Sequence, residues 1–173
     1  MLEPQFVTAE FERKGQVISA AMQMTLDDNV ERVWRMLTGP EHLASWLAEG
    51  RIEPFVGGRA KLDFDQSYVV IDSAVTAYEA PYLLEYSWSG PGEPLRPVRW
   101  RLEPIGGVTR LHLTLALPAG EDVARSCAGW SAHLEMLAAA LAGAPMKFPL
   151  PTFKAARAVY DAQLAQLSVP SAH

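Results

Sequence analysis

The stretch from Glu121 to Gly143, EDVARSCAGWSAHLEMLAAALAG, decides the fold of this chain. Its large apolar residues recur at helical spacing and predict one buried face of a long helix, formed by Val123, Trp130, Leu134, Leu137 and Leu141. The opposite face carries small and charged residues: Arg125, Ala128, Ala132, Glu135 and Ala139. Glu121 and Asp122 place negative charge at the first turn, and Gly143 followed by Pro145 predicts the end of the helix.

Six stretches before this helix predict β-strands, because strand-forming residues alternate between apolar and polar and turn residues separate them. They are Gln16–Thr25, Gly58–Phe64, Tyr68–Tyr78, Leu83–Trp88, Val98–Glu103 and Thr109–Leu117. Connections such as Asp65-Gln66-Ser67 are too short for crossover helices, so the last five strands are expected to be antiparallel neighbours. One face of this sheet is apolar and the other charged, so a single layer must cover it. The long helix is the predicted element that fits.

Two short helices are predicted after the first strand. Asp27 and Asp28 are the expected caps of the first, which ends at Gly39, and the second is expected over Glu41–Leu47. Residues 1–15 are expected to form a loose arm or an edge strand that turns at Gly15.

The region after the long helix is divided by three prolines. They predict an extended connector from Pro145 to Pro151. Phe153, Ala156, Tyr160, Leu164 and Leu167 then predict a final helix outside the core, and Val169–His173 are expected to fray. The chain is thus divided into an arm (1–15), a central domain (16–144) and an accessory tail (145–173).

Composition and charge exclude several classes of partner. The 173 residues are 49% hydrophobic and 20% charged, which is typical of one globular domain. A net charge of -5 with no Lys/Arg cluster argues against nucleic acid as a partner. No apolar run approaches the roughly 20 residues of a membrane span. With Cys127 as the single cysteine and no signal-peptide pattern, a cytoplasmic location is expected.

Six successive runs carry a family resemblance: VWRMLTGPEHLASWL from Val33, VGGRAKLDF from Val56, YLLEYSW from Tyr82, VRWRLEP from Val98, GGVTRLHLTL from Gly106 and GWSAHLEMLAAALAG from Gly129. In this order the sequence resembles the SRPBCC (START-like) superfamily, and within it the homologues of the activator of the heat-shock-protein-90 ATPase. The resemblance implies an α+β helix-grip fold. A curved antiparallel sheet of about six strands would wrap around the long C-terminal helix, with an internal pocket open near the short helices.

No catalytic or metal-binding motif is present in the sequence. The four histidines (His42, His112, His133 and His173) are scattered, no serine stands in a nucleophile context, and no cofactor is predicted. The candidate ligand-binding residues are instead those that periodicity places on or beside the inward faces: Trp46, Phe64, Tyr86, Trp88, Trp100, Leu113, Trp130, His133, Leu134 and Leu137. For these aromatic residues, pocket lining and plain core both remain open.

The predicted function is non-catalytic binding of a hydrophobic or aromatic small molecule, such as a lipid or polyketide-like compound, in a cavity between sheet and helix. The resemblance implies two alternatives. One is a co-chaperone-like module with a role in the stress response and a chaperone as partner. The other is a cyclase or dehydratase, for which His133 and the Tyr86 hydroxyl are the available acid-base groups. The sequence leaves a homodimer open.

Overall fold

The computed structural model describes residues 6–64 and 69–167. The predicted turn at Asp65–Ser67, the strand start at Tyr68 and the end Val169–His173 lie outside these residues. The elements are β1 (Glu10–Lys14), β2 (Val17–Leu26), α1 (Val30–Thr38), α2 (Pro40–Leu43), β3 (Glu49–Ile52), β4 (Arg59–Phe64), β5 (Val69–Glu79), β6 (Leu83–Ser87), β7 (Pro97–Ile105), β8 (Val108–Pro118), α3 (Val123–Leu141) and α4 (Leu150–Leu167).

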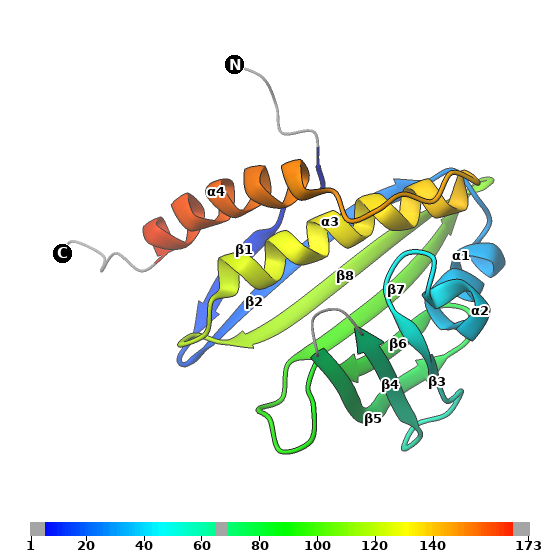
Figure 1. Ribbon diagram of the computed structural model, residues 1–173, viewed down its shortest axis with the longest axis horizontal. Coiled ribbons are helices and arrows are strands. Elements are labelled where there is room, and N and C mark those ends of the chain that lie inside the picture. The colour runs from blue at the N-terminus through cyan, green and yellow to red at the C-terminus, as the bar shows by residue number, and fades with distance from the viewer. Residues whose placement is uncertain (1–5, 65–68, 168–173) are drawn as a thin grey trace.

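The strands of the described residues form one antiparallel sheet of eight, in the order β1-β2-β8-β7-β6-β5-β4-β3. The predicted meander of consecutive neighbours is confirmed from β4 to β8, and β2 pairs with β8 through all its length from Val17 to Leu26. Helix α3 lies along one side of the sheet, with α1 and α2 beside one of its ends (Figure 1). The predicted α+β class with one helix covering an antiparallel sheet is therefore confirmed.

The predicted number of about six strands is wrong, because two edge strands add to it. β1 pairs with β2 across a turn at Gly15, where φ is 62°, so the N-terminal arm is an edge strand. β3 pairs with β4 in a stretch for which no strand was predicted. Both strands have only four or five residues, which is too short for a clear periodic signal, and β1 is almost entirely exposed.

The sheet bends within β5. The first part of this strand, from Val69 to Ala74, pairs with β4, and the second part, from Val75 to Glu79, pairs with β6 across a register shift between Val75 and Ala77. A bulge of this kind increases the local twist and bends the strand. The short strands β3 and β4 consequently turn away from the main sheet, as Figure 1 shows.

The inner face of α3 packs on the sheet as its periodicity predicts. The five stripe residues of this helix, from Val123 to Leu141, are all buried. Trp100 of β7 lies at their centre, with its ring centroid 5.7 Å from that of Trp46 and 5.6 Å from that of Trp130. Trp46 also donates its indole N–H to the Met36 carbonyl at 2.7 Å. Burial of these rings supplies much of the hydrophobic stabilisation.

The opposite face of α3 is covered as well. Ala128 and Ala132, which the pattern assigned to the outer face, are fully buried. Helix α4 packs there, and its Tyr160 hydroxyl lies 2.8 Å from the Val7 carbonyl and 2.7 Å from the Ser131 hydroxyl. The prediction that the final helix lies outside the core is therefore wrong. Small residues let two helices approach closely, but they give a weak hydrophobic signal in a sequence.

The ends of the short helices differ from the prediction by a few residues. Asn29 caps α1 by accepting a hydrogen bond from the Arg32 amide at 2.9 Å, in place of the predicted Asp27 or Asp28. Asp28 instead forms an ion pair with the Arg32 guanidinium at 2.9 Å. Helix α2 ends at Leu43, and turns carry the chain on to β3.

Candidate functional site

A groove of about 680 Å³ lies between the first half of α3 and the neighbouring ends of β4 and β5. Aromatic side chains from five places in the chain border it: Phe64, Trp88, Trp130, Phe148 and Phe153. The ring centroids of Trp88 and Trp130 are 4.7 Å apart, and those of Phe64 and Trp88 are 5.7 Å apart, both edge to face. Its size and lining are typical of small-molecule sites.

Charged residues form one rim of the groove. Arg96, on the connection before β7, makes two hydrogen bonds to the Glu121 carboxylate, at 2.7 and 2.8 Å. This bidentate contact with Arg96 holds the pKa of Glu121 below its ordinary value. Asp122 caps α3 and pairs with Arg157 at 2.8 Å. Within residues 6–64 and 69–167, Arg125 has no acidic partner, so its guanidinium remains available on this rim.

The floor of the groove is open at Gly129 of α3. A Cβ atom built on this glycine would meet no atom within 4 Å outside its immediate neighbours. The sheet therefore does not approach Gly129 closely. The space beside it belongs to the groove.

His133 closes one end of the groove, one helical turn after Gly129. Its Nδ1 atom lies 2.9 Å from the Trp46 carbonyl oxygen. Its ring also contacts Trp130 and Phe148, with centroid distances of 6.1 and 5.5 Å. Burial among these rings lowers the pKa of His133 below its ordinary value of 6.5, so the imidazole is neutral at pH 7.

A smaller hollow adjoins the groove. It has a volume of about 80 Å³ and shares Trp88, Arg96, Ser126 and Trp130 with it. Its other lining residues belong to β7 and β8. The groove thus extends inward, between α3 and the sheet.

The family of the chain follows from its sequence match. Residues 27–142 match the model of the family described as activator of Hsp90 ATPase homolog 1-like protein. The chain belongs to this family. No curated protein matches the sequence closely enough to count as a relative.

Solved structures share the family's helix-grip fold. CalU16 from Micromonospora echinospora aligns with a TM-score of 0.74 at 22% identity, over 94% of this chain and 99% of that one. A conserved protein of unknown function from Enterococcus faecalis, EF2215, aligns with a TM-score of 0.77 at 21% identity, over 93% and 92%. DynU16, a protein in the dynemicin biosynthetic locus, aligns with a TM-score of 0.65 at 26% identity, over 73% of this chain and 48% of that one.

The ten candidate residues separate into two groups in this family member. Four of them border the groove: Phe64, Trp88, Trp130 and His133. The other six are almost completely buried and line neither the groove nor the smaller hollow: Trp46, Tyr86, Trp100, Leu113, Leu134 and Leu137. Burial raises the pKa of the Tyr86 hydroxyl far above its ordinary value, so this group is a poor acid-base catalyst.

The groove also has residues that sequence reasoning missed. Phe148 lies in the proline-rich connector after α3, where no periodicity marks it, and Phe153 was assigned to a helix outside the core. Their ring centroids are 5.7 Å apart at the groove. The one feature of the sequence that could have indicated Phe148 is its position as a large apolar residue between Pro145 and Pro149. No residue of α1 or α2 lines the groove, but its end at His133 meets the chain just after α2, at the Trp46 carbonyl.

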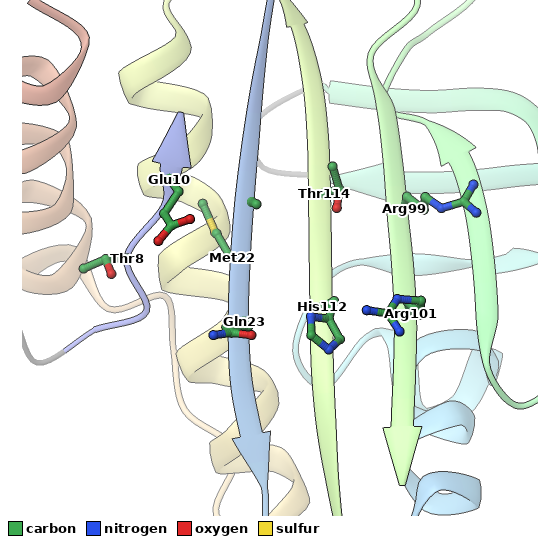
Figure 2. Close-up of a pocket in the computed structure, with 9 residues that line it drawn as sticks. Thr8, Glu10, Met22, Gln23, Arg99, Arg101, His112 and Thr114 are labelled. Atoms are coloured by element: carbon green, nitrogen blue, oxygen red, sulfur yellow. The ribbon is translucent and has the colours of Figure 1, made fainter. Parts of the chain in front are cut away.

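A separate hollow, of about 450 Å³, lies on the outer face of the sheet, away from the groove (Figure 2). Figure 2 shows Gln23, His112 and Arg101 in one row on adjacent strands, in agreement with their register. Arg99 pairs with Glu85 across two strands at 3.2 Å. The outer face of the sheet is therefore charged, as the alternation predicts, and carries cross-strand ion pairs. Its polar lining does not suit an apolar ligand.

Two further features concern other classes of function. Within residues 6–64 and 69–167, no three His, Cys, Asp or Glu side chains lie close enough together to hold a metal ion. Over the same residues, no helix combines the length and apolar character that a bilayer crossing requires.

Proposed function

We propose that this protein binds a hydrophobic or aromatic small molecule, of the lipid or polyketide-like kind, in the groove between α3 and the ends of β4 and β5. The observation that carries the proposal is the open space beside Gly129, bordered by the rings of Trp88 and Trp130. Aromatic faces at the wall of an open groove favour flat, apolar ligands, because stacking and burial act together. Arg125 is available for a polar group at the ligand's outer end.

The proposed site includes fewer of the candidate residues than the predicted internal cavity. The ligand would contact Phe64, Trp88, Trp130 and His133, while the six buried candidates would hold these four in place from behind. Phe148 and Phe153 would complete the outer wall, so the tail after residue 144 contributes to the site. Residues 16–144 are proposed as the main binding unit because they carry Phe64, Trp88, Trp130 and His133, and residues 145–173 would add only the outer wall.

Two features support binding without catalysis. Tyr86 lies in the core away from the groove, which removes one of the two expected acid-base groups. His133 has a carbonyl as its Nδ1 partner, so no carboxylate is there to stabilise an imidazolium. The location of DynU16 in a biosynthetic locus supports a small molecule as the ligand class.

Native mass spectrometry of freshly purified protein tests the proposal first, since a co-purified small molecule would add to the mass of the chain. Equilibrium dialysis with 2-methoxynaphthalene then compares the wild type with Gly129→Ala and Gly129→Leu. Ala at this helix position should raise the free energy of unfolding by about 0.5–1 kcal/mol, because no atom opposes the added methyl group. Both variants should bind more weakly, Leu more so than Ala. A folded Gly129→Leu protein with wild-type affinity would refute the site.

A second candidate function is interaction with a chaperone, which the family's description favours. The charged outer face of the sheet, with Arg99, Arg101 and His112 around a hollow, is the surface that we propose for such a contact. The ATPase rate of a purified Hsp90, measured with and without the protein, tests this candidate. An Arg101→Glu variant should lose any effect on this rate, because it reverses a charge on the proposed surface, and the exposed Arg101 side chain has no ion-pair partner to lose among the described residues.

We also propose a cytoplasmic location. The cytoplasm keeps thiols reduced, and Cys127 is a free, buried thiol, which agrees with this location. Burial raises the pKa of Cys127 to about 12, so the thiol stays protonated and unreactive. Fractionation of cells that produce the protein would test this location.

A further inference from the structure

His133 is held in one orientation. Its Nδ1 atom is 2.9 Å from the carbonyl oxygen of Trp46, on the chain after α2, while the histidine itself belongs to α3. A carbonyl oxygen can only accept a hydrogen bond, so Nδ1 carries the proton and donates it. A flip of the ring would move Nδ1 away from this carbonyl and lose the bond. The edge-to-face neighbours Phe64 and Phe148 also flank the ring, with centroids at 6.0 and 5.5 Å.

The other ring nitrogen is therefore an acceptor. A neutral imidazole carries one proton, and Nδ1 holds it, so Nε2 presents a lone pair. Among the described residues Nε2 has no hydrogen-bond partner. No buried side-chain nitrogen or oxygen among these residues lacks a partner, so Nε2 is reachable from outside. His133 borders the groove, and the groove is its route of access.

We propose that the ligand of the groove is a hydroxylated aromatic compound whose hydroxyl group donates a hydrogen bond to His133 Nε2. This inference rests on the proposed function and adds the chemical class of the ligand to it. Trp88, Trp130 and Phe64 contact the apolar rings, and His133 selects the compound that carries a donor at the matching position. An ether or a plain hydrocarbon would leave the lone pair of Nε2 without a partner as it displaced water.

The surroundings suit an acceptor better than a proton-transfer base. A base that took the hydroxyl proton would become an imidazolium among three aromatic rings. The three acidic residues that line the groove, Glu93, Glu121 and Asp122, are all paired with arginines. The hydroxyl therefore keeps its proton and is bound, which agrees with a non-catalytic site.

The experiment compares two probes that differ only in the donor, 2-naphthol and 2-methoxynaphthalene, by equilibrium dialysis at pH 7.5. The wild type should prefer the naphthol by about three- to tenfold, the value of one partly buried hydrogen bond. In His133→Asn, the side-chain amide replaces Nδ1 and keeps a donor for the Trp46 carbonyl, but nothing replaces Nε2. This variant should bind both probes equally. In His133→Gln the amide reaches the Nε2 position, and part of the preference should return.

The two hypotheses fail in different ways. If neither naphthalene binds, the proposed function itself fails. If both bind the wild type equally, or if folded His133→Asn keeps the preference, the groove still binds aromatic compounds but the role of His133 is refuted. A measurement on the wild type tests the inference even if the variants do not fold. The ¹⁵N chemical shift of His133 Nε2 should change when 2-naphthol binds and stay unchanged when 2-methoxynaphthalene binds. A shift of equal size with both probes would also refute the inference.

Discussion

Truncation of Trp130 to alanine tests whether this side chain is part of a groove wall or of a closed core, and Trp46→Ala is its matched control. Both indoles are nearly buried, with 6% of Trp130 and 1% of Trp46 exposed. Trp46 is enclosed and donates to the Met36 carbonyl, whereas Trp130 borders both the groove and the smaller hollow. The two changes remove the same atoms from different surroundings.

The expected magnitudes follow from these surroundings. A buried tryptophan removes roughly 150–250 Å² from water, and truncation in a closed core costs about 3–5 kcal/mol, which includes the cavity left behind. Trp46→Ala should reach the upper end, about 5 kcal/mol, because it also leaves the Met36 carbonyl without a donor. Trp130→Ala should cost about 2–3 kcal/mol, because the space that it leaves joins the groove and fills with water.

Urea unfolding followed by circular dichroism measures the difference. With a slope of about 2 kcal/mol per molar urea, the two midpoints should differ by about 1–1.5 M. The folded Trp130→Ala protein should also bind 2-methoxynaphthalene about tenfold more weakly. If Trp130→Ala costs as much as Trp46→Ala and leaves the affinity unchanged, Trp130 is an ordinary core residue and the groove wall is wrongly assigned.

Three further predictions concern other contacts. Because Arg96 lowers the pKa of Glu121, the folded state gains stability above about pH 4.5 that is lost as the pH falls. The urea midpoint of the wild type should therefore decrease in this acidic range, and Arg96→Leu should reduce the decrease. An identical pH dependence in the two proteins would contradict this prediction. Tyr160→Phe should cost about 1–2 kcal/mol in thermal unfolding, because its hydroxyl is buried with two partners, while the exposed Tyr82→Phe should change nothing; equal effects would mean that α4 packs loosely. Burial lowers the pKa of His133, so the unfolded chain takes up this proton first and the free energy of unfolding should fall as the pH drops below about 6.5; His133→Asn should flatten that region, and a persisting slope would assign it to another group.

The tail shows why a local pattern can be interpreted wrongly. From the sequence, removal of residues 152–173 should lower stability modestly and leave ligand binding intact. In the structure, Ala156 and Tyr160 are fully buried and Phe153 borders the groove. The same deletion should therefore destabilise the fold strongly and weaken binding. The stripe of this helix was found correctly, but the alanines of α3 that receive it do not stand out as an apolar surface.

The candidate site was predicted in part, for a similar reason. Alternation along a strand tells which side chains face inward, and it placed Trp88 and Trp100 correctly on the same side of the sheet. It does not tell how far the facing helix is from each of them. Trp100 meets α3 directly and is core, whereas Trp88 lies near the sheet end where the bend in β5 leaves space.

The sequence by itself determined the long helix and its end at Gly143, the antiparallel order of β4 to β8, and the inward row of apolar residues on these strands. These features depend on periodicity and turn residues, which act over a few neighbouring positions. Only the tertiary structure decided which inward residues border open space, where Phe148 lies, and that His133 borders the groove while its Nδ1 atom meets the Trp46 carbonyl. Each of these depends on a distance between segments far apart in the chain, such as the 2.9 Å contact of His133 with Trp46, and no local pattern encodes that distance.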